Sequence, residues 1–281
     1  MSSVVTGNEA FDVAVRSLID EEDCELPVLP EVATQLLRMT GDVDCEIGDI
    51  VALIKRDQSL TSHLLRIANS LRYSTGVTVS SVQQAVARLG LISVREITVL
   101  ISCQCKVFDV VGFENEIRQS FRRSLAVAAF SQEIARERRM NVEEAFLAGL
   151  LHDVGRPVLL QALSDRRRKR LFSATDSEVA LAASENRIQM ATRLIRTWDL
   201  SPRIAEAVQH QGQPEAAPNC VMQAATLNLA ISLAQSLLDH GPALAAEEAH
   251  PMIAVLNLYP EQFHVILRNQ NLILEWVGSI S

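Results

Sequence analysis

The residues best suited to chemistry are His152 and Asp153, an adjacent pair at the end of an apolar stretch. Residues 144–160 read EAFLAGLLHDVGRPVLL, with apolar residues at helical spacing before the pair and with Gly155 and Pro157 interrupting that pattern after it. An imidazole nitrogen and a carboxylate oxygen can together hold a divalent cation, which would suit metal-assisted phosphate chemistry. A buried His-Asp pair is also a common satisfied polar pair in a core, so the dipeptide leaves both roles open.

The wider segment AFLAGLLHDVGRPVL resembles the central motif of the HD superfamily, and in particular its HDOD branch. Upstream, LPVLPEVATQLL, IKRDQSLTSHLLRIANS and SSVQQAVARLGLISVREI resemble the three ordered blocks of the N-terminal half of HDOD proteins. The family's positions in these blocks are held here by Asp57, Leu60, Thr61, Asn69, Ser70, Leu89 and Gly90. The resemblance runs from about residue 26 to about residue 214, and it implies an all-helical domain in which the His-Asp segment ends a helix.

Composition and apolar spacing predict the same fold class. Of 281 residues, 48% are hydrophobic and 4% aromatic, with 11 Gly and 9 Pro, and the abundance of Ala and Leu favours helices packed on helices. We therefore expect an all-α helical bundle of HDOD type, in which an N-terminal helical subdomain packs on an HD-like helical subdomain. We expect residues 1–25 to form a leader helix and turn, residues 26–215 the HDOD domain, and residues 216–281 C-terminal helices that complete the HD-like bundle.

Charge and targeting signals exclude several classes of function. The chain has 26 basic and 34 acidic residues and a net charge of -8, which opposes binding to the phosphate backbone of nucleic acids. No signal segment and no apolar run of membrane-spanning length is present, so we expect a cytoplasmic protein without membrane contact. Five scattered cysteines predict buried thiols and no disulfide framework. The basic run 166–170 could be a solvated helix face or a contact for an acidic partner or a phosphate.

The resemblance also implies where metal ligands would lie. An active HD hydrolase collects a His from one helix, the His-Asp pair from a second helix, and a later Asp around one or two metals. In this sequence four of the family's ligand positions hold other residues: Arg123, Arg187, Gln211, which is the second position of the family's His-His pair, and a residue near Ile231. The ligand types that remain are His152, Asp153 and His210.

This residue set argues against catalysis. A catalytic metal needs about three protein ligands and an open position. A guanidinium about 4 Å from a divalent cation would be opposed by about 8 kcal/mol at an effective dielectric near 20, and arginine cannot escape by losing its proton. We therefore expect no catalytic residue, metal or other cofactor. Asp153 should instead pair with Arg123 or, second, with Arg187, and Gln211 should belong to the same ion-pair network or ligand pocket.

The leading hypothesis is a non-catalytic HDOD regulatory module in bacterial signal transduction that acts through protein interaction or scaffolding. The resemblance implies signalling partners of the receiver, diguanylate cyclase or phosphodiesterase type. One alternative is a phosphohydrolase acting on a cyclic or other nucleotide, with Fe, Mn, Zn or Mg held by the three remaining ligands. Another is a sensor of small anions in the pocket that the metal has vacated. The oligomeric state is left open.

Overall fold

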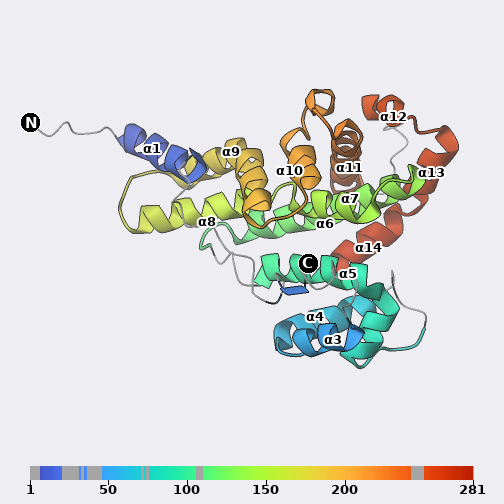
Figure 1. Ribbon diagram of the computed structural model, residues 1–281. Coiled ribbons are helices and arrows are strands. Elements are labelled where there is room, and N and C mark those ends of the chain that lie inside the picture. The colour runs from blue at the N-terminus through green and yellow to red at the C-terminus, as the bar shows by residue number, and fades with distance from the viewer. Residues whose placement is uncertain are drawn as a thin grey trace, which may run out of the picture.

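The structure, a computed structural model, describes residues 7–20, 32, 35–36, 46–70, 73, 76–105, 110–241 and 250–280. Every regular element within these ranges is a helix, so the predicted all-α class is confirmed. The helices form a small N-terminal group and a larger group that contains the His152 segment (Figure 1). The division of the chain at residues 25 and 215 stays a prediction.

The small group consists of α3 (Ile47–Ile54), α4 (Gln58–Ala68) and α5 (Val82–Cys105), which contact one another. In the sequence Asp57 stands where it can cap the following helix. In α4 the Asp57 carboxylate accepts a hydrogen bond of 3.0 Å from the Leu60 N–H and satisfies one of the free donors of the first turn. α5 breaks at Gly90, whose φ of 78° is readily adopted by glycine. For residues 92–111 the family resemblance and the length of the segment favour a helix. The helix reaches Cys105, residues 106–109 lie outside the described ranges, and residues 110 and 111 are not helical.

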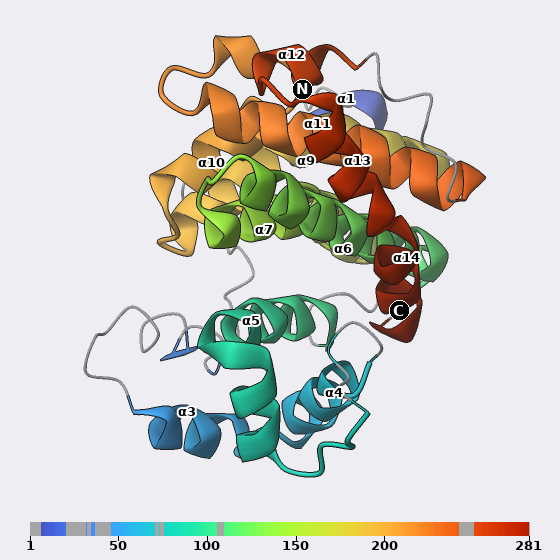
Figure 2. The same cartoon turned by 90° about the vertical axis from the view of Figure 1, so that its right-hand side faces the viewer.

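The larger group follows in chain order from residue 114. Its elements are α6 (Glu114–Glu137), α7 (Val142–Leu151), α8 (Gly155–Arg168), α9 (Asp176–Thr197), α10 (Pro202–Gln209), the short 3-10 helix η1 (Pro214–Ala216), α11 (Val221–His240), α12 (Pro251–Val255), α13 (Pro260–Arg268) and α14 (Gln270–Ile280). α6 packs along α7 and α11, and α8 packs along α9. α14 contacts α6 and also reaches α4, while α5 contacts α7, so two helices link the groups (Figure 2).

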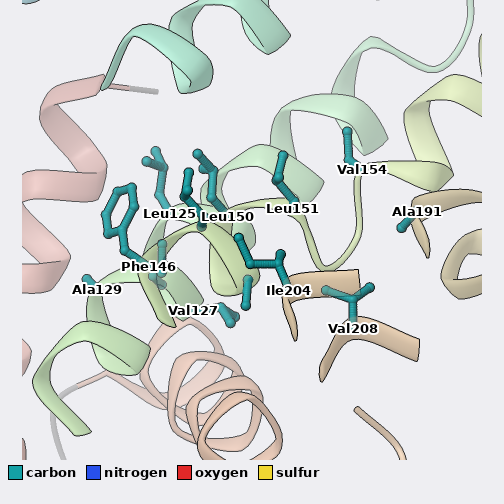
Figure 3. Packing of buried hydrophobic residues seen from close by; sticks show 14 of the residues in the cluster. Leu125, Val127, Ala129, Phe146, Leu150, Leu151, Val154, Ala191, Ile204 and Val208 are labelled. Atoms are coloured by element: carbon teal, nitrogen blue, oxygen red, sulfur yellow. The ribbon is translucent and has the colours of Figure 1, made fainter. Parts of the chain in front are cut away.

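The interior of the larger group is apolar. Figure 3 shows the side chains of Leu125 from α6, Leu150 from α7 and Ile204 from α10 gathered in this interior, and all three are buried. Burying one such side chain contributes about 1.5 to 3 kcal/mol to the free energy of unfolding. This packing fixes the helices that carry the His-Asp pair.

Two helices of the larger group have well-defined starts. The Asn141 side chain accepts hydrogen bonds from the N–H groups of Glu143 and Glu144 at the start of α7. At the start of α9, Thr175 and Glu178 form a reciprocal capping box. α7 leads into His152 and α9 carries Arg187. The two caps therefore fix the residues at which two helices of the candidate site begin.

The N-terminal helix α1 (Gly7–Asp20) lies on α8 and α9 (Figure 1). Arg193 of α9 donates a hydrogen bond of 2.8 Å to the carbonyl oxygen of Leu18, in the last turn of α1. Carbonyls in that turn have no partner within the helix and carry the negative end of its dipole, so a guanidinium there is favourable. Arg166 of α8 donates to the Ala14 carbonyl oxygen over 2.8 Å. Two arginines thus attach α1 to the larger group.

The basic run 166–170 is largely engaged within the protein. Besides the contact of Arg166 with α1, Arg167 forms an ion pair of 2.7 Å with Asp176, and Arg168 forms an ion pair with Asp165. Three of the five charges in this run therefore already have partners, which favours the solvated-face interpretation over a phosphate contact.

The cysteine prediction can be followed at one position. Cys220 is a free, buried thiol whose pKa is raised by burial and further by the carboxylate of Glu206. A raised pKa keeps the thiol protonated and poorly reactive. Cys24 and Cys45, and the side chains of Cys103 and Cys105, lie outside the described part of the structure.

Within the described ranges, α11 is the one helix long and apolar enough to cross a membrane by length and composition. Half of its most apolar window is buried inside the protein, and it contacts α6, α7 and α10. These are the surroundings of a core helix, so its hydropathy is explained by packing.

Candidate functional site

The His-Asp pair lies in a three-residue turn between two helices. α7 ends at Leu151, residues 152–154 form the turn, and α8 begins at Gly155. The predicted position of the pair at the end of a helix agrees with the end of α7. The prediction that Gly155 and Pro157 interrupt the helical pattern is wrong, because both residues lie in the first turn of α8. Pro157 is tolerated there because the first-turn N–H groups of a helix have no intrahelical partner.

Two glycines bring neighbouring helices unusually close to this turn. A Cβ added at Gly149 would lie 2.6 Å from the Cα of Ala128 on α6. A Cβ added at Gly155 would lie 2.1 Å from the carbonyl oxygen of Arg187 on α9. Both distances are below any normal contact, so only glycine allows α7 to approach α6 and α8 to approach α9 this closely. The approach at Gly155 places Arg187 beside the turn.

Asp153 is held from two helices. Its side chain is 3% exposed, and its Oδ2 accepts a hydrogen bond of 2.7 Å from the hydroxyl of Ser120 on α6. Its Oδ1 lies 3.1 Å from Nε of Arg187 on α9, which makes an ion pair, although Oδ1 has no hydrogen bond of good geometry. The Arg187 guanidinium also donates to the Ser184 carbonyl oxygen over 3.0 Å. The buried carboxylate is therefore neutralised by a cation that is itself anchored on α9.

His152 is buried beside Asp153 and points its Nδ1 at the Gly149 carbonyl oxygen, 2.7 Å away. This contact assigns the proton of the neutral ring to Nδ1, because a carbonyl oxygen can only accept. Burial lowers the pKa of His152, Asp153 opposes that shift, and the positive charges of Arg187 and Arg123 add to it. His152 is thus a neutral core residue near pH 7.

Gln211 connects the end of α10 to the turn. Its side-chain amide donates hydrogen bonds to the carbonyl oxygens of His152 (3.2 Å) and Val208 (3.0 Å). Its backbone carbonyl oxygen accepts a hydrogen bond of 2.7 Å from Asn228 on α11. The residue is buried, and it acts as a link between the turn, α10 and α11.

The comparisons with known proteins identify the family at this point. The family model of the HDOD domain matches residues 26–214. The chain belongs to the HDOD family. The expectation from the motifs around His152 and in the three upstream blocks is thereby confirmed.

Individual relatives are distant. The chain is 22% identical over 209 residues to an uncharacterised protein of Treponema pallidum (strain Nichols), a match that covers 71% of this HDOD chain and 40% of that relative. The chain therefore spans less than half of the relative's length.

Solved structures with the same fold come from several bacteria. One from Shewanella amazonensis SB2B, named as a candidate phosphohydrolase, has a TM-score of 0.72 at 20% identity, covering 95% of this chain and 98% of that one. An HDOD domain protein of unknown function from Geobacter sulfurreducens has a TM-score of 0.68 at 21% identity, covering 97% and 98%. A candidate signal transduction protein from Marinobacter aquaeolei VT8 has a TM-score of 0.66 at 23% identity, covering 98% and 65%. Identities this low establish the shared fold and nothing further.

The other predicted site residues of this HDOD chain are not gathered around Asp153. Arg123, the first-ranked partner, lies on α6 and lines a different pocket between α6 and α11, so the ion pair forms with the second-ranked Arg187. His210 caps the end of α10, where its side chain makes no hydrogen bond or ion pair within the described residues. A cavity of about 10 Å³ adjoins Asp153, which is room for about one water molecule and not for an anionic ligand.

Ser120 was missed by the sequence analysis. It lies one helical turn before Arg123, on the side of α6 that is buried, whereas Arg123 is only partly buried. The signal was the spacing of Ser120 and Ser124, two small polar residues four apart that share one helix face. Both serines are buried and line the small cavity beside Asp153.

A catalytic metal does not fit these residues. The described part of the chain holds no group of three or more His, Cys, Asp or Glu side chains placed to bind an ion. Asp153 is engaged by Ser120 and by the permanent charge of Arg187, which a cation would have to displace. The arrangement can tie three helices together.

Proposed function

We propose that this HDOD chain is a non-catalytic regulatory module that acts in bacterial signal transduction by binding other proteins in the cytoplasm. The observation that carries the proposal is the pairing of Asp153 with Arg187, 3.1 Å apart, at the place where a hydrolase would hold its metal. A carboxylate used in this way stabilises the domain instead of contributing to a reaction. The helical domain then serves as a scaffold for interaction surfaces.

The partners we propose follow from the family and from charge. The resemblance to the HDOD family implies partners of the receiver, diguanylate cyclase and phosphodiesterase types, so these classes are the first to test. The net charge of -8 argues against a nucleic acid as the partner. Direct binding can be measured by calorimetry between the purified chain and purified domains of each class. A defined stoichiometry with one class would support the proposal, and no binding to any of them would remove it.

The competing function is a metal-dependent phosphohydrolase. It would need His152, Asp153 and His210 to meet at one ion, whereas Asp153 is paired and His210 lies at the end of α10. The test is hydrolysis of cyclic dinucleotides, cyclic mononucleotides and nucleoside triphosphates with Mn, Fe or Mg supplied. We expect no turnover above that of a His152→Ala, Asp153→Ala variant. Turnover that disappears in this double variant would replace the regulatory proposal with the hydrolase.

A further inference from the structure

A pocket of about 260 Å³ lies between α6 and α11, and no residue of the His-Asp turn lines it. The two helices run antiparallel, since Thr226 near the start of α11 contacts Met140 just beyond the end of α6, with 3.7 Å between Oγ1 and Sδ. The pocket lies at the opposite end, where α6 begins and α11 finishes. Each helix contributes residues at spacings of three and four, which form one face: Gln119, Arg122 and Arg123 from α6, and Gln235, Leu238 and Asp239 from α11.

The two cations of this pocket are Arg122 and Arg123. Within the described residues, neither Arg122 nor Arg123 makes a hydrogen bond or an ion pair, and Arg123 is partly buried. Two other arginines of the larger group differ, because Arg187 is paired with Asp153 and Arg193 binds the end of α1. Two adjacent guanidiniums without counter-ions repel each other and supply many donors, which is the arrangement that binds a phosphate group.

The rest of the lining limits the class of ligand. Asp239 is exposed at the end of α11 and makes no hydrogen bond or ion pair within the described ranges. Its negative charge opposes a bare anion nearby and favours a ligand that brings a positive or hydrogen-bond-donating group to it. The amides of Gln119 and Gln235 can donate to or accept from either part of such a ligand. The volume admits a small molecule but not a folded partner.

We propose that this pocket binds a small phosphate monoester that also carries an amino group, with the phosphate on Arg122 and Arg123 and the amino group on Asp239. The site is distinct from the His-Asp turn, because neither Asp153 nor Arg187 lines it. The inference goes beyond the proposed regulatory function and does not depend on it. If no protein partner bound, the proposal for this pocket would be unaffected. If the pocket bound no phosphate monoester, the proposed regulatory function would be unaffected.

Isothermal titration calorimetry with two probes tests the proposal. O-phosphoethanolamine carries both groups, and methyl phosphate carries the phosphate alone. We expect the wild type to bind both, with O-phosphoethanolamine the tighter. The Arg122→Gln, Arg123→Gln variant should bind each probe roughly tenfold or more weakly, since charged hydrogen bonds are lost. Asp239→Asn should retain methyl phosphate binding and lose the preference for the amino probe.

The matched control is Arg118→Gln, an exposed arginine on the same helix that does not line the pocket, and it should bind as the wild type does. Circular dichroism melts should show that all variants remain folded, because the substituted side chains have no partners to lose. No binding by the wild type, or equal weakening in the Arg118→Gln control, would overturn the site. If Asp239→Asn still bound O-phosphoethanolamine more tightly than methyl phosphate to the same degree, the placement of the amino group on Asp239 would be overturned.

Discussion

The carboxylate of Asp153 is buried and charged, so its neighbours decide whether it stabilises or destabilises the fold. Taking a carboxylate out of water costs several kcal/mol, and only a well-placed cation and hydrogen-bond donors offset this. Ser120 supplies the donor and Arg187 supplies the charge. These two contacts join α6 and α9 to the turn that follows α7, as coordination of a metal would otherwise do.

Removing the cation should therefore be costly. Arg187→Ala leaves a buried carboxylate without its counter-charge, and we expect the free energy of unfolding to fall by about 3 kcal/mol, at the lower end of the range for buried pairs because Arg187 is 36% exposed. Urea denaturation measures the change. Arg123→Ala is the matched control and should change stability little, because that arginine pairs with nothing in the described structure. Equal stability of both variants would show that the ion pair is not structural.

His152 makes stability depend on pH. Burial holds its pKa below the ordinary value of 6.5, so as pH falls the unfolded chain takes up a proton that the folded chain does not. The free energy of unfolding should fall as pH drops from about 6.5 towards the folded pKa, by up to about 1.4 kcal/mol per pH unit, and the contribution is fully present above that window. Denaturation curves across this range should show a slope that His152→Gln removes. The same slope in both proteins would contradict the assignment.

At the scale of elements, close helix packing positions the site. Gly149 and Gly155 let α7 and α8 touch their neighbours through backbone atoms, with no space for a methyl group. Within a helix, alanine is normally more favourable than glycine by about 1 kcal/mol. At Gly149 and Gly155 this gain in helix propensity is opposed by the steric clash of the added methyl group. The clash is the larger of the two, because the nearest atoms belong to the backbone of α6 and α9 and cannot move independently.

We expect Gly155→Ala to lower the free energy of unfolding by about 3 kcal/mol through overpacking against α9. The substitution should also disturb the ion pair, since Arg187 supplies the carbonyl oxygen that the new methyl group would meet. Thermal and urea unfolding report the loss. Gly212→Ala serves as the control, because nothing lies within 4 Å of a Cβ added there. A stability gain in Gly155→Ala would mean that α8 and α9 lie further apart than described.

Sequence reasoning succeeded where the signal is local. The cap at Asp57 and the helix that precedes His152 are predicted from residues only a few positions apart. The structure has both features. The partner of Asp153 depends instead on Ser120 and Arg187, each more than 30 positions away, and on how closely α8 approaches α9 at Gly155. Spacing along the chain carries no information on that approach, which is why Arg123 was ranked first and Ser120 was not considered.

For the whole molecule, α1 extends the HDOD domain at its N-terminal side. The family match begins at residue 26, yet α1 packs on α8 and α9 of the larger group and buries Phe11, Val15 and Leu18. Its last turn is held by Arg193. The helix therefore belongs structurally to the bundle that contains the His-Asp turn.

Deleting residues 1–20 should leave the domain folded but less stable. The deletion exposes apolar surface on α8 and α9 and leaves Arg166 and Arg193 without their carbonyl partners, so faster amide hydrogen exchange is expected in α9. Hydrogen exchange followed by mass spectrometry measures this effect element by element. Exchange in α3 and α4, which belong to the small N-terminal group and not to the helices on which α1 packs, is the internal reference. Unchanged protection of α9 would show that α1 contributes nothing to the bundle.

The most direct test of the central claim is elemental analysis of protein purified without chelator after growth with iron, manganese and zinc supplied. Because Arg187 neutralises Asp153 and the described residues offer no third ligand beside His152, we expect well below one equivalent of any of these metals. The His152→Ala, Asp153→Ala variant should contain the same trace amount. One or more equivalents in the wild type, lost in that variant, would show that the turn binds a metal and would contradict the claim.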